Sequence, residues 1–174
     1  MNTLLSFNRL RSLVLMALVM TVFAVGCKQS APEINPNNSP VEGNWHIKAM
    51  KVNPAINLGA PFGTVSDLMP LLLELSGSTC LTDLTIKFKG DGSISSDNPT
   101  SCKDLDPEET TGVDTNGRWA LNGDQITLTD SDGAKTIYKA TFSGNTMNWS
   151  YQEQMEDESG KTGTYTITLV FTKA

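Results

Sequence analysis

Three cysteines and one histidine are the residues of this chain best suited to chemistry. A cysteine thiolate can act as a nucleophile, bind a metal or close a disulfide, and His46 could serve as a general base. His46 has no second histidine beside it, faces outward by strand alternation, and belongs to no Ser-His-Asp set. Cys80 and Cys102 lack a Cys-x-x-Cys partner and a nearby histidine. We therefore predict no enzyme activity, no metal site and no cofactor.

Acidic side chains form two groups in which a cation could bind. The first group follows Cys102 and the second is predicted to fill the last hairpin turn; they are Asp104, Asp106, Glu108, Glu109 and Asp114, then Glu153, Glu156, Asp157 and Glu158. Clustered oxygens can bind Ca²⁺, but neither run has the spacing of an EF-hand. Paired glycosidase carboxylates need a cleft, which open turns do not offer. We predict solvated loops, with Ca²⁺ binding left open.

Length and charge limit what these residues can belong to. The chain has 174 residues with 39% hydrophobic and 18% charged positions, which suits one domain with a core of useful size. Arg9 and Arg11 lie in the first 26 residues and all 19 acidic residues follow, so the net charge of −6 becomes −8 without that segment. An acidic protein does not match a phosphate backbone, and we predict no nucleic-acid partner.

The first 26 residues have the pattern of a secretory signal. Two arginines precede an apolar run over residues 13–25, which is too short to span a bilayer of about 30 Å. The following letters FAVGC, residues 23–27, resemble the lipobox of bacterial lipoproteins. This resemblance implies cleavage before Cys27 and a lipid anchor on it, and Lys28 in the next position favours the outer membrane. The alternative is an ordinary cleaved signal that leaves Cys27 as a free thiol.

The lipid anchor, if present, accounts for the odd cysteine. With Cys27 modified, Cys80 and Cys102 remain as a pair, and a disulfide between them would stabilise the domain by about 3 kcal/mol. Residues 27–40 are rich in Pro and Asn and predict a flexible tether. The domain organisation is therefore a signal peptide over residues 1–26, a tether over 27–40 and one folded domain over 41–174.

From Gly43 onward, short runs of alternating apolar and polar residues are separated by turn signals. Hairpin chemistry occurs at residues 91–92, 122–123, 132–133 and 144–145. The predicted inward residues of the eight strands are Trp45, Ile47 and Ala49; Leu84, Ile86 and Phe88; Ile94; Trp119 and Leu121; Ile126 and Leu128; Tyr138, Ala140 and Phe142; Met147, Trp149 and Tyr151; and Tyr165, Ile167, Leu169 and Phe171. Successive hairpins predict an all-β, antiparallel, eight-stranded up-and-down barrel.

One segment breaks this pattern. Residues 64–75 predict a short helix between the first and second strands, with Thr64 and Asp67 in a capping arrangement and a bend at Pro70. The segment could be a lid or plug packed on one end of the barrel, or a mobile gate for a ligand.

The opening Gly43-Asn44-Trp45 resembles the Gly-x-Trp motif of the lipocalins, and residues 41–173 are similar in layout to the lipocalin-like domains of bacterial lipoproteins. The resemblance implies that Trp45 packs across the closed end of the barrel, often under an arginine from the last strand. Arg118 is the only arginine after the leader and lies in the fourth strand, so this partner is not assigned. The resemblance also implies binding of a small, mostly apolar molecule in the barrel mouth.

Aromatic residues dominate the predicted interior. The rings are Trp45, Phe88, Trp119, Tyr138, Phe142, Trp149, Tyr151, Tyr165 and Phe171, of which Trp45, Phe88, Trp119, Tyr138, Trp149, Tyr151 and Tyr165 are the ligand-binding candidates. They could line a pocket or simply fill the barrel. Two functions remain open for a monomer held at the outer membrane by its lipid: a binder of a small hydrophobic ligand, or a filled barrel that contacts another protein or a glycan.

Overall fold

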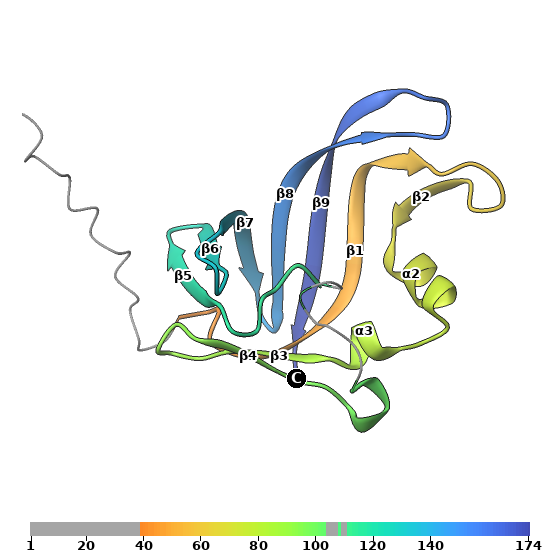
Figure 1. Cartoon of the computed structure of the whole chain (residues 1–174). Helices are drawn as coiled ribbons and strands as arrows, with labels where there is room; N and C mark the ends of the chain where they lie inside the picture. Colours follow the sequence, from red (N-terminus) through yellow and green to blue (C-terminus); the bar gives the residue numbers. More distant parts are fainter. Residues whose placement is uncertain (1–38, 104–107, 109–110) are drawn as a thin grey trace, which may run out of the picture. The chain divides into compact units, whose positions relative to one another are not determined.

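The computed structural model describes residues 39–103, 108 and 111–174. These residues form one antiparallel sheet, in which eight strands follow the order β4-β3-β1-β9-β8-β7-β6-β5 and β2 is attached to β1 (Figure 1). The strands are β1 (Gly43–Asn57), β2 (Thr64–Asp67), β3 (Thr85–Phe88), β4 (Ile94–Asp97), β5 (Arg118–Asn122), β6 (Gln125–Thr129), β7 (Lys135–Ser143), β8 (Thr146–Glu156) and β9 (Thr162–Lys173). The helical segments are α2 (Met69–Ser76), α3 (Cys80–Asp83) and the 3-10 turn η2 (Thr100–Cys102).

The sheet curls into a nearly closed barrel. β1 pairs with both β3 and β9, so the first strand joins the last one. The two ends of the strand order, β4 and β5, meet only near the β3–β4 turn, where Ser93 and Arg118 form a single bridge. Arg118 Nη2 also donates to the Asp91 carbonyl at 2.8 Å, and the Trp119 amide donates to the Gly92 carbonyl at 2.8 Å. The predicted eight-stranded, antiparallel up-and-down barrel is confirmed.

A bulge in β1 corrects one predicted orientation. The register passes from Ile47 opposite Phe171 to Ala49 opposite Val170, which leaves Lys48 as an extra residue. Because directly opposed residues point to the same face, Ala49 shares the face of Val170 and not the interior face of Phe171. Strict alternation, which assumes that no residue is inserted, was therefore wrong about the direction of Ala49 but right about its burial, since Ala49 is 9% exposed and counts among the buried apolar residues.

The segment before α2 is also different from the prediction. Residues 64–67 form β2, which pairs with the end of β1 through Asn57↔Thr64 and Ile56↔Val65. The helix begins only at Met69, and Pro70 lies in its first turn, where it needs no hydrogen-bond donor. β1 is long enough to offer a pairing edge here, and that edge outweighs the local capping signal. The short helix α3 was not predicted.

Two apolar clusters fill the interior. The large cluster is built around Trp45, Phe88, Trp119, Trp149 and Phe171, which are at most 2% exposed. The small cluster comprises Val52, Ile56, Tyr165 and Ile167.

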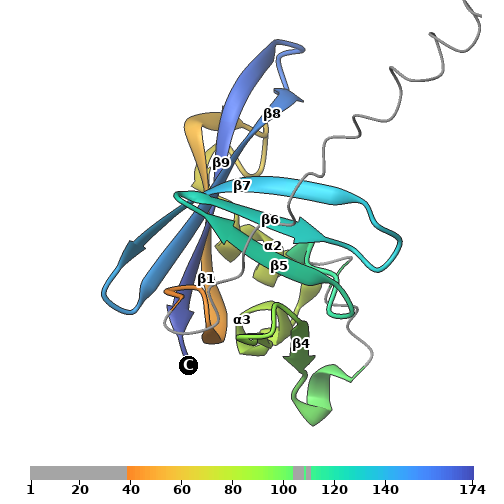
Figure 2. The same ribbon diagram turned by 90° about the vertical axis from the view of Figure 1, so that its left-hand side faces the viewer.

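The sheet opens between β7 and β8, and we call this opening the β7–β8 split. The two strands pair only from Lys139↔Ser150 to Ser143↔Thr146. Beyond this point the first part of β7 pairs with β6, whereas β8 continues alongside β9. Figure 2 shows β7 running away from β8 and β9 at a steep angle.

A disulfide joins Cys80 in α3 to Cys102 in η2, with the two Cα atoms 5.5 Å apart. It connects the segment before β3 to the segment after β4, and this predicted pair is confirmed. Among the described residues, no helix is long and apolar enough to cross a bilayer. The predictions made for residues 1–38, including the leader and Cys27, and for Asp104, Asp106 and Glu109 lie outside the described residues.

Candidate functional site

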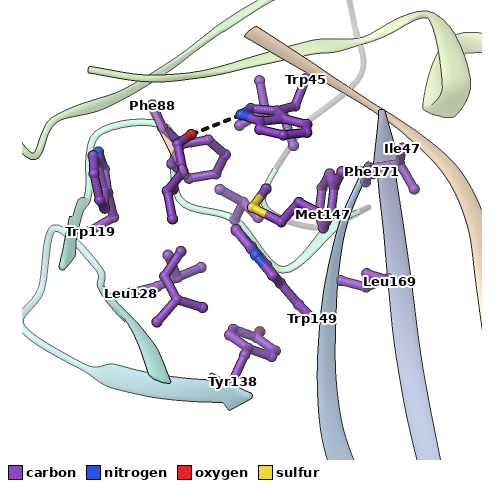
Figure 3. Packing of buried hydrophobic residues seen from close by; sticks show 14 of the residues in the cluster. Trp45, Ile47, Phe88, Trp119, Leu128, Tyr138, Met147, Trp149, Leu169 and Phe171 are labelled. Carbon is purple, nitrogen blue, oxygen red and sulfur yellow. Dashed lines mark hydrogen bonds between the residues drawn. The ribbon is translucent and has the colours of Figure 1, made fainter. Parts of the chain in front are cut away.

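Five of the seven ligand-binding candidates lie together in the large cluster: Trp45, Phe88, Trp119, Tyr138 and Trp149. Apart from that of Trp45, their rings are joined by ring-to-ring contacts, and Trp149 is at the centre of these contacts (Figure 3). Its ring centroid lies 5.3 Å from that of Phe88, 5.4 Å from that of Tyr138 and 4.6 Å from that of Phe171. The candidates therefore pack as a core in this structure. Edge-to-face and stacked aromatic pairs of this kind each add about 0.5–1.5 kcal/mol beyond area burial.

The three indole nitrogens have different environments. Trp45 Nε1 donates to the Val41 carbonyl at 2.8 Å, and Trp119 Nε1 donates to the Lys89 carbonyl at 3.0 Å. Trp149 is 0% exposed, and its Nε1 has no hydrogen-bond partner within the described part of the chain. The sequence gives no signal that distinguishes these three nitrogens.

Lys173 lies over the ring of Trp45, a position for which no residue was assigned from the sequence. Its ammonium lies 5.4 Å from the centroid of the Trp45 ring, on the last residue of β9. The resemblance implies an arginine in this position, none was assigned because the last strand has no arginine, and the structure places this lysine there. A cation over an indole face is worth about 0.5–1 kcal/mol at an exposed site. This contact joins the end of β9 to β1, and the amide of Lys173 also donates to the Asn145 carbonyl at 2.9 Å.

At the β7–β8 split the aromatic core reaches the surface through a pair of tyrosines, which we call the tyrosine rim: Tyr138 and Tyr151. Their rings meet edge to face at a centroid distance of 5.6 Å, and Tyr151 is half-buried. Burial raises the pKa of Tyr138 to about 12, with smaller contributions from Tyr151 and Asp130. Burial also raises the pKa of Tyr151, and Glu153 adds to the rise. Both hydroxyls are therefore neutral at physiological pH.

The seventh candidate, Tyr165, lies apart from the others in the small cluster. Two half-buried residues, Met50 and Tyr151, pack against both clusters and connect them. The structure thus places the seven candidates in three positions: a packed core, a rim and the small cluster.

The first acidic group contains a residue that is not solvated. Asp114 is 3% exposed, and its two carboxylate oxygens accept hydrogen bonds from the Asn116 amide at 2.7 Å and the Ser131 amide at 2.6 Å. These bonds, that from Ser131 first, lower the pKa of Asp114 against the opposing effect of burial. The prediction of a solvated loop was wrong at Asp114, which instead ties the loop before β5 to the β6–β7 turn. This tie also holds the buried Val113 in the large cluster.

The second acidic group is spread over two kinds of structure. Glu153 and Glu156 belong to β8, so the prediction that the turn contains all four acids was wrong for these two. In the turn, Asp157 accepts hydrogen bonds from the Ser159 and Lys161 amides at 2.9 and 3.0 Å. No group of three or more His, Cys, Asp or Glu side chains among the described residues is arranged to hold a metal.

His46 has a structural contact. It is half-buried, and its Nδ1 lies 3.0 Å from the Leu84 carbonyl, next to the start of β3. This contact links β1 to the end of α3. The position of the His46 ring agrees with the outward direction expected from strand alternation.

Helix α2 is anchored on the barrel mainly through its first residue, Met69. Met69 is 3% exposed in the large cluster, and Leu72 and Leu73 pack partly against it. Asp67 accepts from the amides of Met50 and Met69 at 3.2 and 3.1 Å and from Lys51 Nζ at 2.7 Å. Burial opposes these bonds, but the net effect is a lowered pKa of Asp67. The packing favours a plug over a mobile gate.

Two surface pockets border α2. One of about 320 Å³ is lined by residues that include Phe62, Val65 and Leu71. The other, of about 390 Å³, lies beside the disulfide and includes Leu73 and Cys80. No ligand-binding candidate named above lines either of these two pockets.

Comparison with known proteins identifies the family. A family model described as a lipocalin-like domain matches residues 41–149, which is more than half of the 174-residue chain. A comparison with curated proteins found no match, and neither did a comparison with solved structures. The matched stretch begins at Val41, whose carbonyl accepts the Trp45 indole bond, and ends at Trp149 in the centre of the aromatic core. The chain therefore belongs to the lipocalin-like domain family.

Proposed function

We propose that this chain is a non-enzymatic, lipid-anchored lipoprotein of the bacterial outer membrane, whose lipocalin-like barrel binds a small hydrophobic molecule as a monomer. The observation that carries the proposal is the tyrosine rim, where an aromatic core meets the surface at the β7–β8 split. Tyr151 is half-buried there and its ring meets that of Tyr138, and both residues belong to or pack against the large cluster. Membership of the lipocalin-like domain family supports the same proposal, and the barrel of this chain encloses apolar side chains.

The rim is suited to an apolar molecule with few polar atoms. Its accessible surface comes from the half-buried phenol ring of Tyr151, and Met50, a flexible thioether side chain, packs against the same two clusters as Tyr151. The two phenol hydroxyls remain neutral and can donate or accept one hydrogen bond each. Each CH₂ group that a ligand buries here would contribute about 0.8 kcal/mol.

The proposed lipid anchor is inferred from the sequence that precedes the barrel. Lipidation of Cys27 would leave eleven residues between the anchor and Ser39, the first described residue. At about 3.3–3.6 Å per residue this tether reaches at most about 40 Å. A barrel so tethered stays close to the membrane surface, which is a source of hydrophobic molecules.

Ligand binding is tested with a fluorescent hydrophobic probe and the full chain carrying Cys27→Ser, so that no acyl group competes. The probe should bind, and a fatty acid or a sterol should displace it. Tyr151→Ala should weaken probe binding about fivefold or more. The control Ile137→Ala, which removes a side chain 57% exposed on the outer face of β7, should leave it unchanged. Absence of probe binding at high probe concentration would contradict the proposal.

The anchor has its own test. Cells that express the full chain are supplied with a labelled palmitate analogue, and the protein in the outer-membrane fraction is examined for label. Wild type should carry label, and Cys27→Ser should carry none and move to the soluble fraction. Label that persists on the Cys27→Ser protein contradicts the anchor.

A second candidate function is a module that contacts another envelope protein. The observation in its favour is Phe62, which is 41% exposed and lines the surface pocket of about 320 Å³ together with Val65 and Leu71. This alternative predicts that the hydrophobic probe does not enter the barrel. It also predicts that a photo-crosslinker placed at residue 62 captures a specific envelope protein, whereas one placed at residue 137 does not.

A further inference from the structure

The unpartnered indole nitrogen of Trp149 is the starting point. Trp149 is 0% exposed, and its Nε1 meets no acceptor among the described residues, whereas Trp45 and Trp119 each donate to a backbone carbonyl. A buried donor without a partner is rare in folded proteins, and it destabilises the fold by the cost of removing the N–H from water. An acceptor that is brought by a bound molecule would remove this cost.

The surroundings of this nitrogen restrict the acceptor. The rings of Phe88, Tyr138 and Phe171 contact the indole, and Met147, two residues earlier on the same face of β8, offers only a thioether, a weak acceptor. Of the residues that the structure describes, the buried polar ones are Thr111 and Asp114, so no lysine or arginine is buried near the rings. A buried carboxylate would have no cation to pair with.

The register places Trp149 directly beneath the tyrosine rim. On β8, Trp149 and Tyr151 are two residues apart and point to the same face, into the barrel. Trp149 lies opposite Ala140 of β7 and Leu169 of β9, inside the paired part of the sheet, whereas Tyr151 lies just beyond Ser150, where β7 has left β8. A molecule that enters at the split therefore meets the rim first and Trp149 next.

We propose that Trp149 Nε1 donates a hydrogen bond to a neutral oxygen of the hydrophobic ligand, and that the barrel thereby selects ketones, esters or alcohols over free carboxylic acids. This inference rests on the proposed function and specifies its ligand class. Ala140 lies opposite Trp149 on β7, and the ring of Tyr138, also on β7, stacks on the indole at a centroid distance of 5.4 Å. A ligand therefore reaches the indole only when it displaces a side chain of the tyrosine rim. An ionised acid is disfavoured because burying an unpaired charge costs far more than burying a carbonyl.

Indole NMR tests the hydrogen bond without any substitution at the site. The chain has three tryptophans, so the ¹H–¹⁵N spectrum of the full Cys27→Ser chain has three indole signals. Trp→Phe variants assign them. The Trp149 signal should lie upfield of the other two in the free protein and move downfield on addition of a long-chain methyl ketone. A signal that exchanges with a buried water and does not move with the ketone overturns the proposal.

A comparison of three probes tests the selectivity. The methyl ketone, the fatty acid of equal length and the corresponding hydrocarbon are titrated at pH 7. Wild type should bind the ketone about tenfold or more tightly than the acid. Trp149→Phe keeps a ring but removes the N–H, and it should weaken ketone binding about tenfold while hydrocarbon binding changes little. Trp119→Phe, whose nitrogen already has a partner, should leave the ratio of ketone to hydrocarbon affinity unchanged.

The outcomes separate the two proposals. If the probes bind but the acid binds as tightly as the ketone, or Trp149→Phe weakens ketone and hydrocarbon equally, the inference is overturned and the ligand-binding function stands. If no probe binds to wild type, the ligand-binding function fails and the inference fails with it. Circular dichroism and a thermal melt establish whether Trp149→Phe is folded. If it is not, the NMR result on the Cys27→Ser chain, which retains Trp149, decides the matter.

Discussion

Asp114→Asn is the substitution with the clearest expected effect on stability. The carboxylate accepts two backbone amides at 2.6 and 2.7 Å while only 3% exposed. Asparagine can retain one acceptor but presents an NH₂ group to the second amide. Hydrogen bonds to a charged group contribute about 1.5–3 kcal/mol each, and an unmet buried amide adds its own cost. We therefore expect a loss of about 2–4 kcal/mol at pH 7, a large part of a typical domain stability of about 5–15 kcal/mol.

The pH dependence of this loss follows from the lowered pKa of Asp114. A carboxyl whose folded pKa lies below its unfolded value of about 3.9 stabilises the fold above that value, and this contribution disappears as the pH falls through the folded pKa. Once the wild-type carboxyl is protonated it resembles asparagine. The difference between wild type and Asp114→Asn should therefore be largest above about pH 5 and shrink toward zero in strong acid.

Urea unfolding followed by tryptophan fluorescence at pH 7 and at pH 3 measures the difference, provided that the m-values agree. Asp124→Asn is the control, because Asp124 is 65% exposed and lies 3.8 Å from Lys139 in a surface ion pair. It should change stability by less than about 0.5 kcal/mol. A loss below about 0.5 kcal/mol for Asp114→Asn at pH 7, or a loss that does not shrink in acid, would refute the role given to this carboxylate.

Substitutions at three further places test the parts of the barrel that frame the site: the disulfide, Lys173 and Met69. Replacing Cys80 and Cys102 together by alanine should lower the unfolding free energy by about 3 kcal/mol, measured against wild type with and without reductant; equal stability in both would contradict a structural disulfide. Lys173→Met should destabilise by about 0.5–1 kcal/mol in urea unfolding, whereas Lys173→Arg should not, because only a cation interacts with the Trp45 ring; equal effects would argue against the contact. Met69→Ala should lower stability by about 2–5 kcal/mol in the same assay if α2 is a plug, and a loss below 1 kcal/mol would favour a mobile gate.

The fold was largely predictable because its signals are local. Alternation along β9 and turn pairs such as Asn122-Gly123 define strands and hairpins within a few residues of sequence. The predictions were wrong where the structure of a segment depends on pairing with a strand that is far away in the sequence. Ala49 faces outward because Lys48 is inserted opposite β9, and residues 64–67 form β2 because the far end of β1 offers an edge. Neither pairing can be deduced from the local pattern.

The site was predictable only in its residue types. Alternation identified the inward rings, but whether an indole nitrogen meets a carbonyl depends on backbone atoms far along the chain, such as Lys89 for Trp119. The acidic residues before β5 were predicted to be solvated because they are charged. Asp114 is buried instead, and its carboxylate accepts a hydrogen bond from the Ser131 amide in the β6–β7 turn. Lys173 was not assigned as the partner of Trp45, because the resemblance implies an arginine there.

Native mass spectrometry of the protein isolated from its own host shows most directly whether this barrel carries a small hydrophobic molecule. We predict a stoichiometric adduct of a few hundred daltons, in addition to any lipid on Cys27, that is released on unfolding and is reduced in Tyr151→Ala. A protein mass without adduct, in a sample that also fails to bind hydrophobic probes, would contradict the account.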